Sequence, residues 1–219
     1  MRIAAIGGTG KEGRGLACGW ARAGEAVIVG SRSLERAQQT AGEINAAVGR
    51  EVASGSTYRN AAMAADIVVL TVPYDAQEKT LWDIREGIRG KILVTATVPI
   101  DTGNARRLRV VPGGSAAEEA QTLLGPETRV VAAFQNISHA HLERLGAIDS
   151  DVLVCGDDAE ARQEVIRLAA LLGLRALEAG PLRYARVVEG LTVLLLEMNR
   201  RYKSRGAGIR VTGLPEGGQ

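Results

Sequence analysis

The chain has 219 residues, enough to bury the core of one α/β domain with an appendage. Its formal net charge of +2 and its 3% aromatic content argue against a surface built to bind nucleic acid. The longest apolar run near the C-terminus, residues 191–196, is too short to cross a membrane, and we expect no signal peptide. Two cysteines, Cys18 and Cys155, predict a reduced cytoplasmic protein without a disulfide framework.

The first thirty residues predict one βαβ unit. Residues 2–7 form an apolar run typical of a buried parallel strand, and residues 26–30 form a second. Between them, residues 15–23 predict a helix of small residues, ended by Gly24. The turn from the first strand into this helix has the G-x-G-x-x-G spacing of dinucleotide-binding folds, in Gly8, Thr9, Gly10, Lys11, Glu12 and Gly13.

Each glycine of this turn has its own steric role. Gly8 allows the tight turn out of the strand, Gly10 lets the backbone approach a pyrophosphate, and Gly13 lets the helix lie close to the sheet. The unpaired N–H groups and the positive dipole end at the start of the helix then bind the pyrophosphate. The alternative is an ordinary glycine turn, which a chain with 27 glycines can contain by chance.

The end of the second strand indicates which dinucleotide is bound. NAD-specific folds place an acidic residue there to accept from the ribose 2′-hydroxyl. This chain has Ser31 and Arg32 instead, with Arg36 one helical turn further on. A hydroxyl and a guanidinium group bind a 2′-phosphate that a carboxylate would repel, so the sequence predicts NADP(H). In the alternative interpretation, Ser33 caps the next helix and Arg36 is solvated.

Two later strands end in Val-Pro. Residues 66–73 and 91–99 are apolar runs, and they finish at Thr71, Val72 and Pro73 and at Val98 and Pro99. Proline cannot continue a central strand, so each pair marks a carboxyl edge, where open parallel sheets bind ligands. We expect both loops to border the nicotinamide, although each can also be a plain strand exit.

The remaining pattern completes the fold class. Helices are expected at 34–48, from Ser115 onward, at 159–172 and at 184–202, with strands at 129–134, 151–158 and 174–179. This alternation predicts an α/β fold: a Rossmann-type, doubly wound, mostly parallel sheet. We expect a dinucleotide-binding domain over residues 1–145 and a smaller C-terminal domain over 146–219. No metal site is expected.

The last expected helix carries more apolar residues than one buried face needs. We expect it to pack against its own sheet and against a second copy of the chain, forming a homodimer. The cations that follow, Arg200, Arg201, Lys203 and Arg205, either compensate the helix C-terminus or bind an anion.

Several segments together resemble the NADPH:coenzyme F420 oxidoreductase family over nearly the whole chain. They include the glycine turn from Gly7 to Gly13, Gly30-Ser31-Arg32, Thr71-Val72-Pro73, Ser115 to Glu118, Val154 to Asp158, Ala179 to Leu182 leading into Glu189 to Thr192, and the tail residues Arg201 to Lys203 and Gly208 to Gly213. The resemblance implies hydride exchange between reduced F420 and NADP, in a homodimer, with the deazaflavin over the nicotinamide in a cavity roofed by the C-terminal part.

The resemblance also implies roles in the deazaflavin cavity. Thr9 and Ile137 would form its walls with the two Val-Pro edges, and Gln135 and Asn136 would orient the ring by hydrogen bonds. We expect Thr9, Gln135 and Ile137 to govern hydride transfer. Relatives often have histidine at the position of Gln135, whose amide can donate a hydrogen bond but cannot change charge. His139 and His141 are expected to be carried away by a following helix.

Three alternatives remain open from the sequence. The protein can be an NADPH-dependent flavin reductase or flavin-linked metal reductase, a small-molecule dehydrogenase or imine reductase, or a non-catalytic NADP sensor. No acid–base pair stands out in the sequence, which favours transfer between two cofactors over reduction of a carbonyl.

Overall fold

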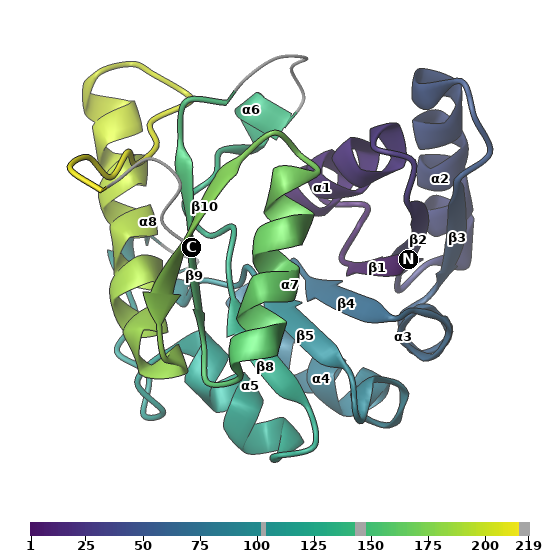
Figure 1. The fold of residues 1–219 in the computed structure, drawn as a ribbon, viewed down its shortest axis with the longest axis horizontal. Helices are drawn as coiled ribbons and strands as arrows, with labels where there is room; N and C mark the ends of the chain where they lie inside the picture. The colour runs from purple at the N-terminus through teal and green to yellow at the C-terminus, as the bar shows by residue number, and fades with distance from the viewer. Residues whose placement is uncertain (102–103, 143–147, 215–219) are drawn as a thin grey trace.

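The computed structural model describes residues 1–101, 104–142 and 148–214, and Figure 1 shows its fold. The described strands are β1 (Arg2–Ile6), β2 (Ala26–Ser31), β3 (Ala53–Thr57), β4 (Ile67–Leu70), β5 (Ile92–Thr95), β6 (Ile100–Asp101), β7 (Asn104–Leu108), β8 (Arg129–Ala132), β9 (Asp151–Gly156) and β10 (Arg175–Gly180). The described helices are α1 (Lys11–Arg22), α2 (Leu34–Val48), α3 (Tyr58–Ala64), α4 (Tyr74–Ile88), α5 (Ala116–Leu124), α6 (His139–Leu142), α7 (Ala159–Ala170), the 3₁₀ turn η1 (Leu182–Tyr184) and α8 (Ala185–Arg201).

Eight strands form one sheet in the order β10-β9-β8-β5-β4-β1-β2-β3. All neighbours are parallel except β8 and β9, which pair antiparallel. The chain builds outward from β1 to β3 on one side, then crosses to β4 and builds outward on the other. This confirms the doubly wound, mostly parallel α/β fold. The reversal of direction between β1 and β4 is a switch point, where the carboxyl ends of the strands open a ligand crevice.

The sheet is covered on both faces, so its central strands are apolar on both sides. One face packs against α1, α2 and α7 through a core that includes Leu16, Ile44 and Leu168. The other packs against α3, α4, α5 and α8 through a core that includes Leu81, Ile84 and Val188. In Figure 1, α1 and α2 stand at one end of the molecule and α8 at the other.

Some elements differ from those expected from the sequence. Strands β4 and β5 end at Leu70 and Thr95, before their Val-Pro pairs, and Pro73 directly precedes α4. Helix α4 was not expected because two residues of its buried stripe, Gln77 and Thr80, are polar and interrupt the apolar period. The polar edge strand β3, the short helix α3 and the β6–β7 hairpin were not expected either.

Candidate active site

The glycine turn has the geometry that a bound pyrophosphate requires, with one change in the roles of its residues. The residue in the left-handed conformation is Gly7 (φ +87°), not Gly8. Gly8 is needed for space instead, because a Cβ there would lie 2.7 Å from the carbonyl oxygen of Ala5. A Cβ on Gly13 would lie 2.7 Å from the carbonyl oxygen of Gly7, which confirms that Gly13 lets α1 approach the sheet.

The start of α1 is free to bind an anion. Gly10 precedes the helix in an extended conformation. The carbonyl oxygen of Gly10 accepts the first hydrogen bond of the helix, from Arg14 N (2.8 Å). The backbone N–H groups of Lys11, Glu12 and Gly13 precede that bond and point out of the helix end.

Two arginines and two serines lie at the carboxyl end of β2. Ser31 is buried and its hydroxyl accepts from the backbone N–H of Ser33. The Ser33 hydroxyl in turn caps α2 by accepting from Arg36 N, as the alternative interpretation proposed for this serine. The guanidinium groups of Arg32 and Arg36 belong to exposed residues. Arg32 lies near Tyr58. Burial raises the pKa of Tyr58, and the positive charge of Arg32 partly lowers it again.

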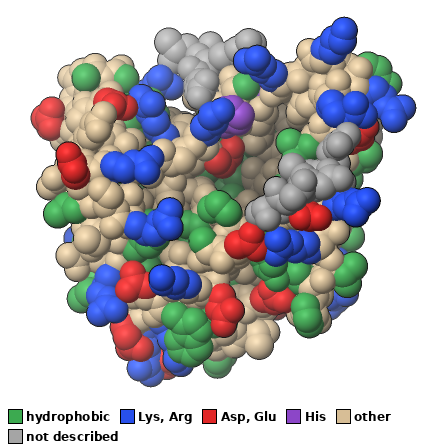
Figure 2. Space-filling view, turned by 180° about the vertical axis from the view of Figure 1, so that it is seen from behind, with side chains coloured by type: hydrophobic (Ala, Val, Ile, Leu, Met, Phe, Trp, Pro, Cys, Tyr) green, Lys and Arg blue, Asp and Glu red, His purple; other side chains and the backbone are tan. Residues whose placement is uncertain are grey.

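A cavity of about 740 Å³ opens at the switch point of the sheet. Figure 2 shows that this face of the molecule is hollowed, with a histidine and several lysine or arginine side chains near the rim. Nine of the residues proposed from the sequence line the cavity: Lys11, Glu12, Thr71, Val72, Pro73, Val98, Gln135, Asn136 and Ile137. Both strand exits and the turn after β8 therefore meet around one space.

Thr9 and Pro99 are not among the described residues of this wall. Thr9 is partly exposed in the glycine turn, and Pro99 is buried. Ser31 and Arg32 at the end of β2 and Arg36 in the first turn of α2 also lie outside it. The structure thus separates the end of β2 from the cavity. His139, which we expected to be carried away, lies on the cavity wall.

The turn after β8 presents two amide oxygens without partners. Phe134 has a left-handed backbone (φ 72°), which is strained for a bulky residue and common at functional sites. It redirects the chain so that the Gln135 amide donates to Thr95 O (3.0 Å), while Asn136 donates to Val188 O and to Thr192 Oγ1 (3.0 Å each). The oxygens Gln135 Oε1 and Asn136 Oδ1 are buried with no hydrogen-bond partner among the described residues.

These amides add an acceptor to what was expected of the site. Gln135 was expected to donate to a ligand; one of its two N–H donors binds Thr95 O, and its oxygen is left without a partner among the described residues. A buried amide oxygen without a partner is costly, so a ligand that donates hydrogen bonds would stabilise this turn.

Helix α8 and the chain after it contribute a wall of the cavity, as the resemblance implied for the C-terminal part, through residues that were not named from the sequence. Thr192 and Leu195 of α8, together with Arg205 and Ala207, line the cavity. The Thr192 hydroxyl donates to Gln135 O (3.0 Å), which ties α8 to the turn after β8. Glu189 is buried and accepts from Ala116 N and Ala117 N at the start of α5. Burial raises its pKa to about 7 against the opposing effect of these two N–H groups.

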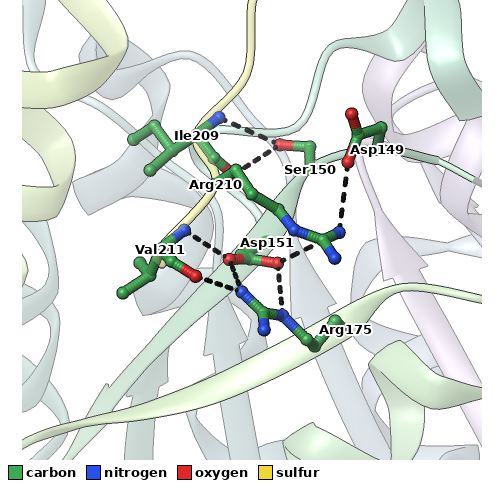
Figure 3. Close-up of polar contacts among 7 residues, drawn as sticks. All are labelled: Asp149, Ser150, Asp151, Arg175, Ile209, Arg210 and Val211. Atoms are coloured by element: carbon green, nitrogen blue, oxygen red, sulfur yellow. Dashed lines mark hydrogen bonds and ion pairs between the residues drawn. The ribbon is translucent and has the colours of Figure 1, made fainter. Parts of the chain in front are cut away.

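The C-terminal segment after α8 is fixed at both ends. At its start, the Ser138 hydroxyl donates to Arg205 O (2.7 Å), and His141 Nε2 lies 2.8 Å from Gly206 O. At its end, Asp151 at the start of β9 accepts from Val211 N (2.7 Å) and from the guanidinium of Arg175, as Figure 3 shows. The segment therefore closes one side of the cavity in a defined position.

The cavity also contains a half-buried acid, Glu12, which was expected only as part of the glycine turn. The Glu12 side chain lies on the cavity wall, and its Oε1 is enclosed with no hydrogen-bond partner among the described residues. Burial raises the pKa of Glu12 to about 8. At neutral pH this carboxyl group is therefore mostly protonated.

Two further observations concern metal ligands and membrane spans. The described part of the chain contains no cluster of three or more metal-ligating side chains. Within the same residues, no helix is both long and apolar enough to cross a membrane.

The switch-point crevice and the glycine turn place the protein in the class of dinucleotide-binding α/β proteins. Residues 2–99 match the family model described as "NADP oxidoreductase coenzyme F420-dependent". The F420-dependent NADP reductase of Methanothermobacter thermautotrophicus is 48% identical, covering 99% of this chain and 97% of that protein. The chain belongs to the F420-dependent NADP reductase family.

A solved structure and a more distant relative are also similar to this chain. A solved structure from Arthrobacter sp. FB24 superposes with a TM-score of 0.83 at 24% identity, covering 97% of this chain and all of that one, which supports the fold. The human metalloreductase STEAP2 is 28% identical over 195 residues, which are 88% of this chain but 36% of that protein.

Proposed function

We propose that this protein is an oxidoreductase that transfers a hydride between NADP(H) and coenzyme F420. The observation that carries the proposal is the cavity at the switch point, which adjoins the glycine turn and leaves two amide oxygens unpaired. The full-length similarity to a protein named F420-dependent NADP reductase supports the same pair of substrates.

The residues fit a nucleotide with a 2′-phosphate. Gly13 leaves space that a Cβ would fill, and the start of α1 offers unpaired N–H groups for the pyrophosphate. Arg32 and Arg36 supply positive charge at the end of β2, with Ser31 beside them. We propose that Ser31 and Arg32 bind the 2′-phosphate, and that Gly8 to Gly13 hold the pyrophosphate.

The cavity fits a flat ring with a polar edge. Its apolar wall includes Val72, Pro73, Val98, Ile137 and Leu195, and its polar groups converge from the turn after β8. F420 supplies a deazaflavin that accepts a hydride and a proton. The protein aligns the two reactants and excludes water, so that the reacting carbons lie about 3–3.5 Å apart. Thr9 is proposed to act from the turn at the edge of this space.

Gln135 is proposed to orient the deazaflavin. Replacing Gln135 with alanine is expected to lower the rate of hydride transfer about tenfold and to leave the NADPH dissociation constant within about twofold, because positioning is lost but nucleotide contacts remain. Stopped-flow kinetics and a separate NADPH titration measure the two quantities. An equal loss in both would show that Gln135 supports the fold and not the ring.

We further propose a homodimer formed through the outer face of α8. Val187, Leu194 and Met198 lie on this helix and are 59%, 55% and 40% exposed, at intervals that place them on one stripe with Leu191. A stripe of this kind on a helix at the end of the molecule is typical of a subunit interface.

Replacing Leu194 with lysine is expected to give a monomer, because the new charge would be buried in an apolar contact. Light scattering at micromolar concentration measures the mass of both proteins. As a control, Leu171→Lys changes a leucine that is 38% exposed at the end of α7 and should leave the mass unchanged. A wild-type monomer would contradict the proposal.

The domain division and the location of the protein stay predictions. Strands β9 and β10 extend the same sheet as β1 to β5 and β8, and the proposed boundary near residue 145 lies outside the described residues. The two free cysteines, Cys18 and Cys155, support the proposed cytoplasmic location.

The choice of second substrate is tested with a panel of acceptors. Purified protein should carry no bound flavin, should oxidise NADPH with F420, and should be slow with FMN, riboflavin or a ferric chelate. Fast turnover with FMN and none with F420 would favour the flavin reductase alternative. Nucleotide binding without turnover of any acceptor would favour the sensor.

A further inference from the structure

Glu12 has the wrong chemistry for an ordinary residue of a pyrophosphate loop. It is the second residue of α1, which begins where two phosphates bind, and an ionised carboxylate would repel them. Its side chain does not turn to solvent but lies on the cavity wall with Thr71, Val72 and Asn136. The Oε1 atom is enclosed and unpaired within the described structure, so the fold leaves one oxygen of this acid for a ligand.

Glu12 stands where the two parts of the site meet. The first turn of α1 holds the pyrophosphate, while the cavity that receives the second substrate begins at the Glu12 side chain. For a hydride to pass between them, the nicotinamide ring must enter the cavity beside this residue. That ring is neutral in NADPH and carries one positive charge in NADP⁺.

We propose that Glu12 pairs with the nicotinamide according to its redox state: Glu12 binds NADPH as the neutral acid and NADP⁺ as the carboxylate. The inference rests on the proposed function. The atoms balance, because each hydride that leaves NADPH is matched by one proton that leaves Glu12. The acceptor F420 takes up one hydride and one proton on reduction, so the proton released is the one the reaction needs.

The local charges allow this coupling. The titratable or charged side chains on the cavity wall are Lys11 of α1, His139 of α6 and Arg205 of the C-terminal segment, while Arg14 on α1 is already paired with Glu43 of α2. Burial alone raises the pKa of Glu12 to about 8. An opposite charge within about 4–6 Å lowers the pKa of an acid by about 1–3 units, which moves Glu12 across neutral pH.

The test uses nucleotide binding alone, without F420. Isothermal titration calorimetry of NADP⁺ and NADPH, in buffers of different ionisation enthalpy, counts the protons exchanged on binding. At pH 7.5 we expect NADP⁺ to release about 0.5 to 0.8 proton and NADPH to release close to none. The release should fall as the pH drops below about 4.5, where the acid stays protonated in the complex, and again above pH 9, where free Glu12 is already ionised.

The matched variant is Glu12→Gln, which keeps the shape of the neutral acid and cannot ionise. It should bind both nucleotides and abolish the proton release. The control Glu43→Gln removes an acid on the neighbouring helix outside the cavity wall and should release protons as the wild type does.

The outcomes separate the inference from the proposed function. Wild-type protein that binds both nucleotides with equal proton exchange, or a Glu12→Gln variant that releases protons as before, overturns the role of Glu12 and leaves hydride transfer intact. Failure of both nucleotides to bind wild-type protein overturns the two proposals together.

Discussion

Replacing Asp151 with alanine is expected to lower the free energy of unfolding by about 2–3 kcal/mol and to weaken binding of the second substrate. Asp151 is fully buried at the start of β9 and accepts from Arg175 Nε (2.8 Å) and from Val211 N (2.7 Å). Without it, the Arg175 guanidinium keeps its hydrogen bond to Val211 O but loses the carboxylate, and the backbone N–H of Val211 loses its acceptor. The loss is smaller than the about 3–5 kcal/mol of a fully buried pair, because Arg175 is partly exposed and regains water.

The effect on the cavity follows from the C-terminal segment. Figure 3 shows Asp151 between Arg175 and the segment that carries Ile209, Arg210 and Val211. In the Asp151→Ala variant Ile209 still binds Ser150 and the backbone N–H of residue 151, so the segment is loosened at this end and holds Arg205 and Ala207 less firmly against the cavity. Binding of F420 should therefore weaken while NADPH binding at the glycine turn is unchanged.

The matched control is Asp149→Ala. Asp149 also pairs with Arg210, but its side chain is 91% exposed, so its loss should cost less than about 0.5 kcal/mol. Urea denaturation of the three proteins measures the difference. The hydrogen bond from Arg175 holds the pKa of Asp151 below its ordinary value, so this stabilisation is present above that value and is lost only as the pH falls below about 4. Equal losses of unfolding free energy in both variants would show that Asp151 does not hold the C-terminal segment in place.

Replacing Arg32 with alanine is expected to weaken NADPH binding by about 1.5–3 kcal/mol, or roughly 10- to 150-fold, and to leave NADH binding nearly unchanged. The guanidinium of Arg32 lies at the end of β2 next to Tyr58, in an exposed position that a 2′-phosphate can reach. Fluorescence titration with the two nucleotides measures the change, and NADH serves as the control because it lacks that phosphate. A similar loss of affinity for both nucleotides would show that Arg32 does not bind the 2′-phosphate.

The parts of the site that sequence predicted correctly are local. The turn from Gly7 to Gly13 folds within one βαβ unit, so the spacing of its glycines is enough to predict α1 against the sheet. The Val-Pro pairs lie beyond the carboxyl ends of β4 and β5, at the expected edge of the sheet, although both strands end before them. Their convergence on one cavity follows from the parallel sheet.

The parts that sequence did not predict depend on contacts between distant segments. Thr192 binds Gln135, 57 residues away, and Asp151 binds Val211, 60 residues away. Neither pair leaves a periodic pattern in the chain. The direction of the Glu12 side chain was equally hidden, because the motif specifies the backbone at this position and not the side chain.

The orientation of the Gln135 side-chain amide was also not predictable from the sequence. The left-handed turn at Phe134 brings one N–H of the Gln135 amide to Thr95 O and leaves the amide oxygen without a partner among the described residues. Phe134 is held there by packing, with its ring 6.0 Å from that of Trp20 in an edge-to-face contact. A phenylalanine with positive φ is rare enough that a sequence pattern does not indicate it.

A single-turnover experiment with stoichiometric NADPH and F420 tests hydride transfer between the two molecules. We expect the absorbance band from which F420 takes its name to disappear as NADPH is oxidised, with one F420 reduced for each NADPH. The band should return when excess NADP⁺ is added, since the same site catalyses both directions. Oxidation of NADPH with the F420 band unchanged, or no reaction while both molecules bind, would contradict hydride transfer between them.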